Sequence, residues 1–167
     1  MRRVTGVRRV TGLRGVAVLL LVCLGLGACS APDQSGSPGQ RVRAWASGVG
    51  LSGTTSQLSG DAAQFAVGRP RLDQAVLQSA CTDLLNDASM GAAGLPTPDP
   101  MLTAELNRAY DAYYRAGQLC LDTGPGGSGG SRSGPGEGRA LGQAAAQMAK
   151  GSAGLAQAQA RIRSIVK

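Results

Sequence analysis

The chain has 167 residues, 17 of them basic and 10 acidic, and no histidine, which excludes His-based catalytic triads, haem ligation by histidine and most zinc sites. Much of the net charge of +7 lies at one end, because five arginines fall within the first 14 residues. The remainder has no basic stripe with interleaved aromatic residues, which argues against nucleic acid as a partner.

Segment 1–28 has the three parts of an export signal in the expected order. Arginines precede an apolar stretch over 16–26, and the small residues Gly27 and Ala28 follow it. The apolar stretch has 11 residues, far fewer than the roughly 20 that a membrane-spanning helix needs. We therefore expect segment 1–28 to be a cleaved signal peptide, whose removal leaves 12 basic and 10 acidic residues and a net charge of +2.

The end of this segment, Leu26-Gly27-Ala28-Cys29, resembles a bacterial lipobox. The resemblance implies that the Cys29 thiol takes a diacylglyceryl group and becomes the first residue of a protein held on the extracytoplasmic face of the cell membrane. Two acyl chains are expected to give stable attachment, because a single chain binds a membrane only marginally. The weaker alternatives are an ordinary secretory signal and a twin-arginine signal at the repeated Arg-Arg-Val-Thr-Gly unit.

Residues 29–40 are rich in Ser, Pro, Gly and Gln and are predicted to be a flexible tether. Beyond the tether, only Cys81 and Cys120 would remain as thiols, since Cys23 leaves with the signal. An exported compartment is oxidising, so we expect these two to form a disulfide. The spacing contains no Cys-x-x-Cys, which argues against a redox or metal-binding pair.

Four segments in the rest of the chain have the apolar periodicity of helices. The first, 41–67, is the weakest, because it has three glycines among its first 13 residues, each costing about 1 kcal/mol relative to alanine. Gly68 suits the left-handed position after a helix, and Pro70 follows it, so a tight turn is expected here. The second segment, 71–90, places apolar residues at spacings of 4, 3 and 4: Leu77, Cys81, Leu84 and Ala88.

Residues 90–100 contain two glycines and three prolines and are predicted to be a non-helical linker. Asp99 is expected to cap the third helix, 100–122, with Pro100 at its first position. This third segment has the most regular apolar seam of the chain, with strict alternation of 4 and 3. The seam consists of Leu102, Leu106, Ala109, Tyr113, Ala116 and Cys120.

Residues 123–138 include eight glycines and three serines and are predicted to be a flexible loop. The fourth helical segment, 139–166, carries a heptad seam. Arg161 and Arg163 near its end are expected to complement the helix dipole. The seam consists of Leu141, Ala144, Met148, Gly151, Leu155, Ala158, Ile162 and Ile165.

The predicted fold is therefore all-α, an antiparallel four-helix bundle over 41–167 with one interhelical disulfide between its second and third helices. The seams consist largely of small residues, and the chain has only one Phe, one Trp and three Tyr. Such a core is thin, so the disulfide is expected to contribute a large part of the stability.

Tyr110, Tyr113 and Tyr114 are the only concentration of aromatic residues. They could form a platform for a glycan or peptide, but the favoured interpretation is that Tyr113 fills the core while the other two flank it with hydroxyls in water.

An enzyme acting on cell-wall material would need Asp99, Glu105 and Asp111 to converge in a cleft, and a solvated helix face is the simpler interpretation. A Ser–Lys dyad built on Lys150 is the other catalytic arrangement left open. We expect no metal and no cofactor.

In overall plan the chain resembles the uncharacterised small helical lipoproteins of high-GC Gram-positive bacteria, a resemblance carried by the lipobox, the tether and the two cysteines. It implies a membrane contact through the lipid anchor and supplies no catalytic residues. We expect a non-enzymatic binding or scaffold module of the cell envelope, with an envelope protein or glycan as partner. The alternative is a carrier or sensor for an apolar ligand such as a lipid or polyprenyl chain.

Overall fold

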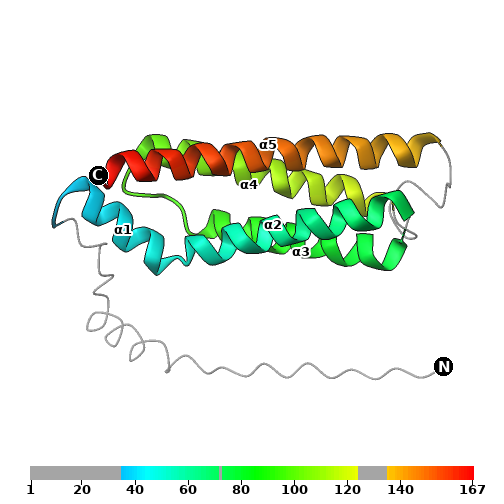
Figure 1. Cartoon of the computed structure of the whole chain (residues 1–167), viewed down its shortest axis with the longest axis horizontal. Coiled ribbons are helices and arrows are strands. Elements are labelled where there is room, and N and C mark those ends of the chain that lie inside the picture. Colours follow the sequence, from blue (N-terminus) through cyan, green and yellow to red (C-terminus); the bar gives the residue numbers. More distant parts are fainter. Residues whose placement is uncertain (1–34, 72, 124–134) are drawn as a thin grey trace, which may run out of the picture. The chain divides into compact units, whose positions relative to one another are not determined.

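The computed structural model describes residues 35–71, 73–123 and 135–167 (Figure 1). Within these ranges the protein is entirely helical, with five α-helices, one short 3-10 helix and no strand. The predicted all-helical class is therefore confirmed for the described part of the chain. Cys29, the signal segment and most of the tether lie outside the described residues.

Helix α1 (Pro38–Gly48) begins inside the segment predicted to be tether. Ser37 and Gln40 form a capping box, in which the Ser37 backbone N–H donates to Gln40 Oε1 at 2.7 Å and the Gln40 N–H donates to Ser37 Oγ at 3.3 Å. Pro38 occupies the first turn, where its missing N–H is not needed. The prediction of a tether up to residue 40 is therefore wrong by three residues, because these caps start the helix at Pro38.

The single first helix predicted over 41–67 is two helices, α1 and α2 (Leu51–Gly68). The break lies at Gly50, which has φ of +63°, a left-handed conformation that glycine adopts without steric cost. The break lets α1 pack against both α2 and α5 (Pro135–Ile165). Trp45 of α1 also donates its indole N–H to the Gly94 carbonyl oxygen at 2.9 Å.

Gly68 is not the left-handed cap that the sequence predicts, because α2 continues directly into the 3-10 helix η1 (Arg69–Arg71). Its role is close packing. A Cβ at residue 68 would lie 3.0 Å from Val76 Cγ1, at the start of α3 (Gln74–Ala93). The absence of a side chain at Gly68 therefore lets the first turn of α3 pack against the end of α2.

Helix α3 extends to Ala93, so residues 90–93 of the predicted linker are helical. Gly91 lies within this helix, and the ring of Tyr110 packs onto it so closely that a Cβ there would lie 2.6 Å from Tyr110 Cε1. Helix α4 (Pro100–Leu121) begins as predicted, with the Asp99 carboxylate accepting a 2.7 Å hydrogen bond from the Leu102 N–H. Helix α5 begins at Pro135, four residues before the expected start at 139, and residues 124–134 of the predicted loop lie outside the described residues.

Successive helices pack side by side, α2 with α3, α3 with α4 and α4 with α5, whereas α2 and α5 contact each other only sparsely (Figure 1). All six positions of the predicted α4 seam are buried, and so are the four of α3. On α5 the seam is buried from Leu141 to Ala158, while Ile162 and Ile165 are partly exposed. The periodicity therefore predicted the core-facing side of these three helices correctly.

A disulfide between Cys81 and Cys120 joins α3 to α4, with 6.0 Å between the two Cα atoms. Both cysteines are buried. The helices approach closely beside it, because a Cβ on Gly117 would lie 2.9 Å from the Cys81 carbonyl oxygen. The predicted pairing of Cys81 with Cys120 is confirmed.

Within the described ranges, no helix combines the length and the apolar character that crossing a bilayer would require.

Candidate functional site

The three tyrosines singled out in the sequence do not share one surface. Tyr113 is buried, and its hydroxyl lies 2.8 Å from Ser152 Oγ on α5. Tyr110 is buried too, against Gly91, and this burial raises the pKa of its hydroxyl to about 12. Tyr110 is buried because the missing side chain of Gly91 makes room for its ring. Tyr114 is 41% exposed.

Tyr110 and Tyr114 nevertheless line a hollow of about 380 Å³ between α3 and α4, together with Ala88, Ser89, Ala92, Asn107 and Asp111. Its wall is mostly alanine and polar side chains, and little of Tyr110 is accessible there because the residue is 3% exposed.

The acidic residues considered as a catalytic set have separate roles. Asp99 caps α4 and also accepts hydrogen bonds from Arg161 of α5, at 2.7 Å to Nε and 3.1 Å to Nη2. The Arg161 guanidinium holds the pKa of Asp99 below its usual range. Asp111 pairs with Arg115 at 3.0 Å on the exposed face of α4. Arg161 therefore ties the end of α5 to the start of α4, a role that its position near a helix terminus did not reveal.

Glu105 and Asp111 both line a polar hollow of about 390 Å³ between α4 and α5, which Asp99 does not reach. Lys150 lies on the same wall, with Arg108 and Arg115. One carboxylate oxygen of Glu105, Oε2, is sealed from solvent and has no hydrogen-bond partner among the described residues.

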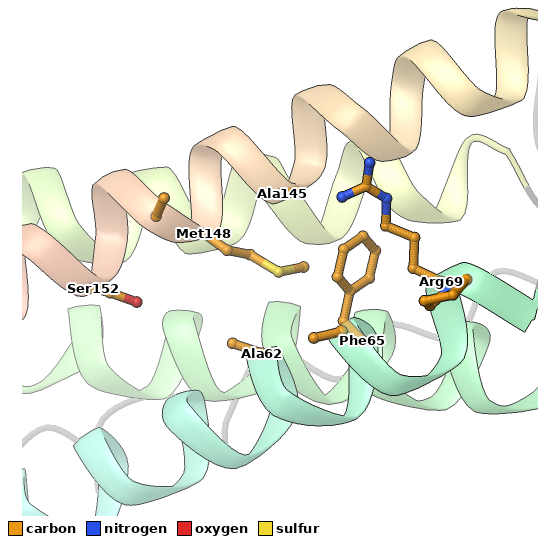
Figure 2. A pocket seen from close by; sticks show the side chains of 9 residues that line it. Ala62, Phe65, Arg69, Ala145, Met148 and Ser152 are labelled. Atoms are coloured by element: carbon orange, nitrogen blue, oxygen red, sulfur yellow. The ribbon is translucent and has the colours of Figure 1, made fainter.

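An apolar hollow with a volume of about 490 Å³ lies between α2 and α5, where these two helices are sparsely packed (Figure 2). We call it the α2–α5 hollow. Phe65 and Met148 are buried at its base, at 2% and 5% exposure, and Figure 2 shows their side chains pointing toward each other from facing helices. The lining residues are Ala62, Phe65, Ala66, Arg69, Pro70, Ala145, Met148, Ala149 and Ser152.

Alanines make room for the α2–α5 hollow. Ala62 and Ala66 on α2, and Ala145 and Ala149 on α5, are spaced four residues apart, so each pair lies on one face of its helix. Larger side chains at these positions would let the two helices touch along their length. The paired i,i+4 alanines were the sequence signal for this hollow, although alanine is too common in this chain for the signal to be noticed.

Arg69 is the only charged residue among those that line the α2–α5 hollow. In Figure 2 its side chain extends past the Phe65 ring toward α5. Among the described residues, its guanidinium has no hydrogen-bond or ion-pair partner. The hollow thus combines an apolar base with one uncompensated positive charge at its edge, which suits an apolar group that carries an anionic end.

In the part of the chain that the structure describes, no group of three or more His, Cys, Asp or Glu side chains is arranged to hold a metal ion. No protein-family model matches the sequence, and comparisons with curated proteins and with solved structures likewise found no match.

Proposed function

We propose that the protein is an exported lipoprotein, anchored through a diacylated Cys29 on the extracytoplasmic face of the cell membrane. Its helical body acts as a non-enzymatic binding or scaffold module of the cell envelope, with an envelope protein or glycan as partner. The order of arginines, apolar stretch and Leu-Gly-Ala-Cys supports the anchor. In this proposal α1 and α2 together form the first member of an antiparallel four-helix bundle, completed by α3, α4 and α5.

The observation that carries the binding role is the α2–α5 hollow. Its volume of about 490 Å³ falls within the range of small-molecule sites. Its base is apolar, and the sparse contact between α2 and α5 leaves it open at the surface. If an apolar side chain of a partner protein inserted between Phe65 and Met148, each Å² of apolar surface that it buried would stabilise the complex by about 25 cal/mol.

A second candidate function, a carrier or sensor for a lipid or polyprenyl chain, is favoured by the unpaired Arg69 beside the apolar base. A chain with a carboxylate or phosphate end would place its tail against Phe65 and Met148 and its charge near this guanidinium. Arg69 contributes to ligand binding only in the carrier or sensor function, so one binding experiment separates the two candidates.

We expect the purified protein to bind a fluorescent single-chain amphiphile through this hollow. Ala149→Phe fills the space between the helices and should weaken binding at least tenfold, because roughly two methylenes of lost contact already amount to about 1.6 kcal/mol. Ala156→Phe, on an exposed part of α5 that does not line the hollow, is the matched control and should change little. Fluorescence titration measures both.

The charge is tested with Arg69→Gln, and Arg71→Gln on the same 3-10 helix is its control. The carrier function predicts that Arg69→Gln weakens binding of an anionic probe about threefold, the effect of a partly exposed charge pair, and leaves an uncharged probe of equal length unaffected. Equal affinity for both probes, lost in Ala149→Phe, would instead favour the docking of a partner's side chain. Absence of any binding that Ala149→Phe reduces would contradict both uses of the hollow.

A further inference from the structure

A buried carboxylate lies on the side of α2 that faces α3. Asp61 is the only charged residue of α2, and it is 8% exposed. Its Oδ2 atom is sealed from solvent and has no hydrogen-bond partner among the described residues. An ionised carboxylate oxygen left without water or a donor is costly, so this position needs a physical explanation.

The neighbours of Asp61 make its ionised form less favourable still. The two charges that act on Asp61 are acidic and both come from α3: Asp87 has the larger effect and Asp83 the smaller. Asp87 is itself buried, at 9% exposure. The other elements that pack against α2 carry basic residues, but none of these is among the groups that act on Asp61. The basic residues on these elements are Arg41 and Arg43 of α1, Arg69 and Arg71 of η1, and Arg139, Lys150, Arg161 and Arg163 of α5.

Two ionised carboxylates can only accept hydrogen bonds, so Asp61 and Asp87 can bond to each other only when one of them carries a proton. A proton between them supplies the missing donor for a sealed oxygen and removes one of two like charges. Burial, followed by the charges of Asp87 and then Asp83, raises the pKa of Asp61 from 3.8 to about 6.

We propose that Asp61 and Asp87 share one proton across the contact between α2 and α3, and that loss of this proton loosens α2 from the rest of the helical body. The proton binds more tightly when α2 is seated than when Asp61 is exposed to water, so raising the pH favours the loosened state. Because α2 supplies Ala62, Phe65 and Ala66, loosening it also removes one wall of the α2–α5 hollow. The shared proton itself does not depend on the hollow being a binding site.

Amide hydrogen exchange of α2 in the purified protein, measured from pH 5 to pH 7.5 and corrected for the intrinsic pH dependence of exchange, tests this proposal. A carboxyl that titrates near pH 6 when seated and near pH 3.8 when exposed predicts that α2 opens about tenfold more often at pH 7.5 than at pH 5. Asp61→Asn keeps the shape of the protonated side chain and should abolish this rise. Asp111→Asn, which removes an exposed carboxylate on α4, should keep it.

A carbon-13 titration of the Asp61 carboxyl in the unmodified protein gives a second readout that needs no variant. A midpoint near pH 6 that falls toward 4 in Asp87→Asn supports the shared proton. A midpoint near 4 in the unmodified protein, or the same pH dependence of α2 exchange in Asp61→Asn, would overturn it. Millimolar Ca²⁺ is added in a parallel series: if it suppresses exchange of α2 at pH 7.5, the carboxylates hold a cation and the shared-proton proposal fails.

Discussion

Reduction of the Cys81–Cys120 disulfide is expected to destabilise the helical body by roughly 4 kcal/mol. The bond closes a loop of 39 residues, and chain-entropy arguments give about this value for the constraint on the unfolded chain. In a body of this size the loss corresponds to a melting temperature lower by roughly 10–20 °C. The effect should be large because the core it supports is thin: among the described residues, the large buried aromatic side chains are Phe65, Tyr110 and Tyr113.

Thermal unfolding followed by circular dichroism, with and without reductant, measures this effect. The double variant Cys81→Ala, Cys120→Ala is the control, since its melting temperature should be low and insensitive to reductant. An unchanged melting curve of the unmodified protein in reductant, after mass spectrometry has shown that the bond is open, would contradict the role given to the disulfide.

The second large effect is expected for Gly117→Ala, which should destabilise the protein by about 2 kcal/mol. The new Cβ would lie 2.7 Å from Leu85 Cγ and 2.9 Å from the Cys81 carbonyl oxygen, closer than such atoms can approach. The backbone oxygen cannot turn away as a side chain can, so α3 and α4 must separate. Alanine's better helix propensity, worth up to about 1 kcal/mol, offsets only part of this cost.

The matched control is Gly60→Ala on α2, where nothing lies within 4 Å of the added Cβ. Here the same substitution should stabilise the protein by about 0.5–1 kcal/mol, because it gains helix propensity without a clash. Urea unfolding of both variants tests the opposite signs. If Gly117→Ala stabilised as much as Gly60→Ala, the close approach of α3 and α4 would not depend on glycine.

The features that the sequence predicted correctly are those encoded locally or by a regular period. Asp99 followed by Pro100 is a local start signal, and α4 begins there. The 4-and-3 spacing of α4 places Leu102 and Cys120 on the buried face. Cys81 and Cys120 are the two thiols that remain once Cys23 is assigned to the signal peptide and Cys29 to the lipid anchor, so their pairing could be predicted without structural information.

The features that the sequence did not predict depend on contacts between distant segments. Gly50 and Gly91 have the same cost in a helix, yet Gly50 lies at the break between α1 and α2, whereas Gly91 lies within α3 against the ring of Tyr110. Arg161 meets Asp99 across 62 positions of sequence, and no local pattern marks such a pair. The burial of Asp61 beside Asp87 likewise depends on how α2 lies against α3.

We propose that a lipidated Cys29 anchors the disulfide-stapled helical body to the membrane. Intact mass of the protein from the membrane fraction, with and without reduction and alkylation, tests both parts directly. We expect a mass equal to residues 29–167 plus a diacylglyceryl group, with two thiols that react only after reduction. An unprocessed or unlipidated mass, or thiols that react without reductant, would contradict it.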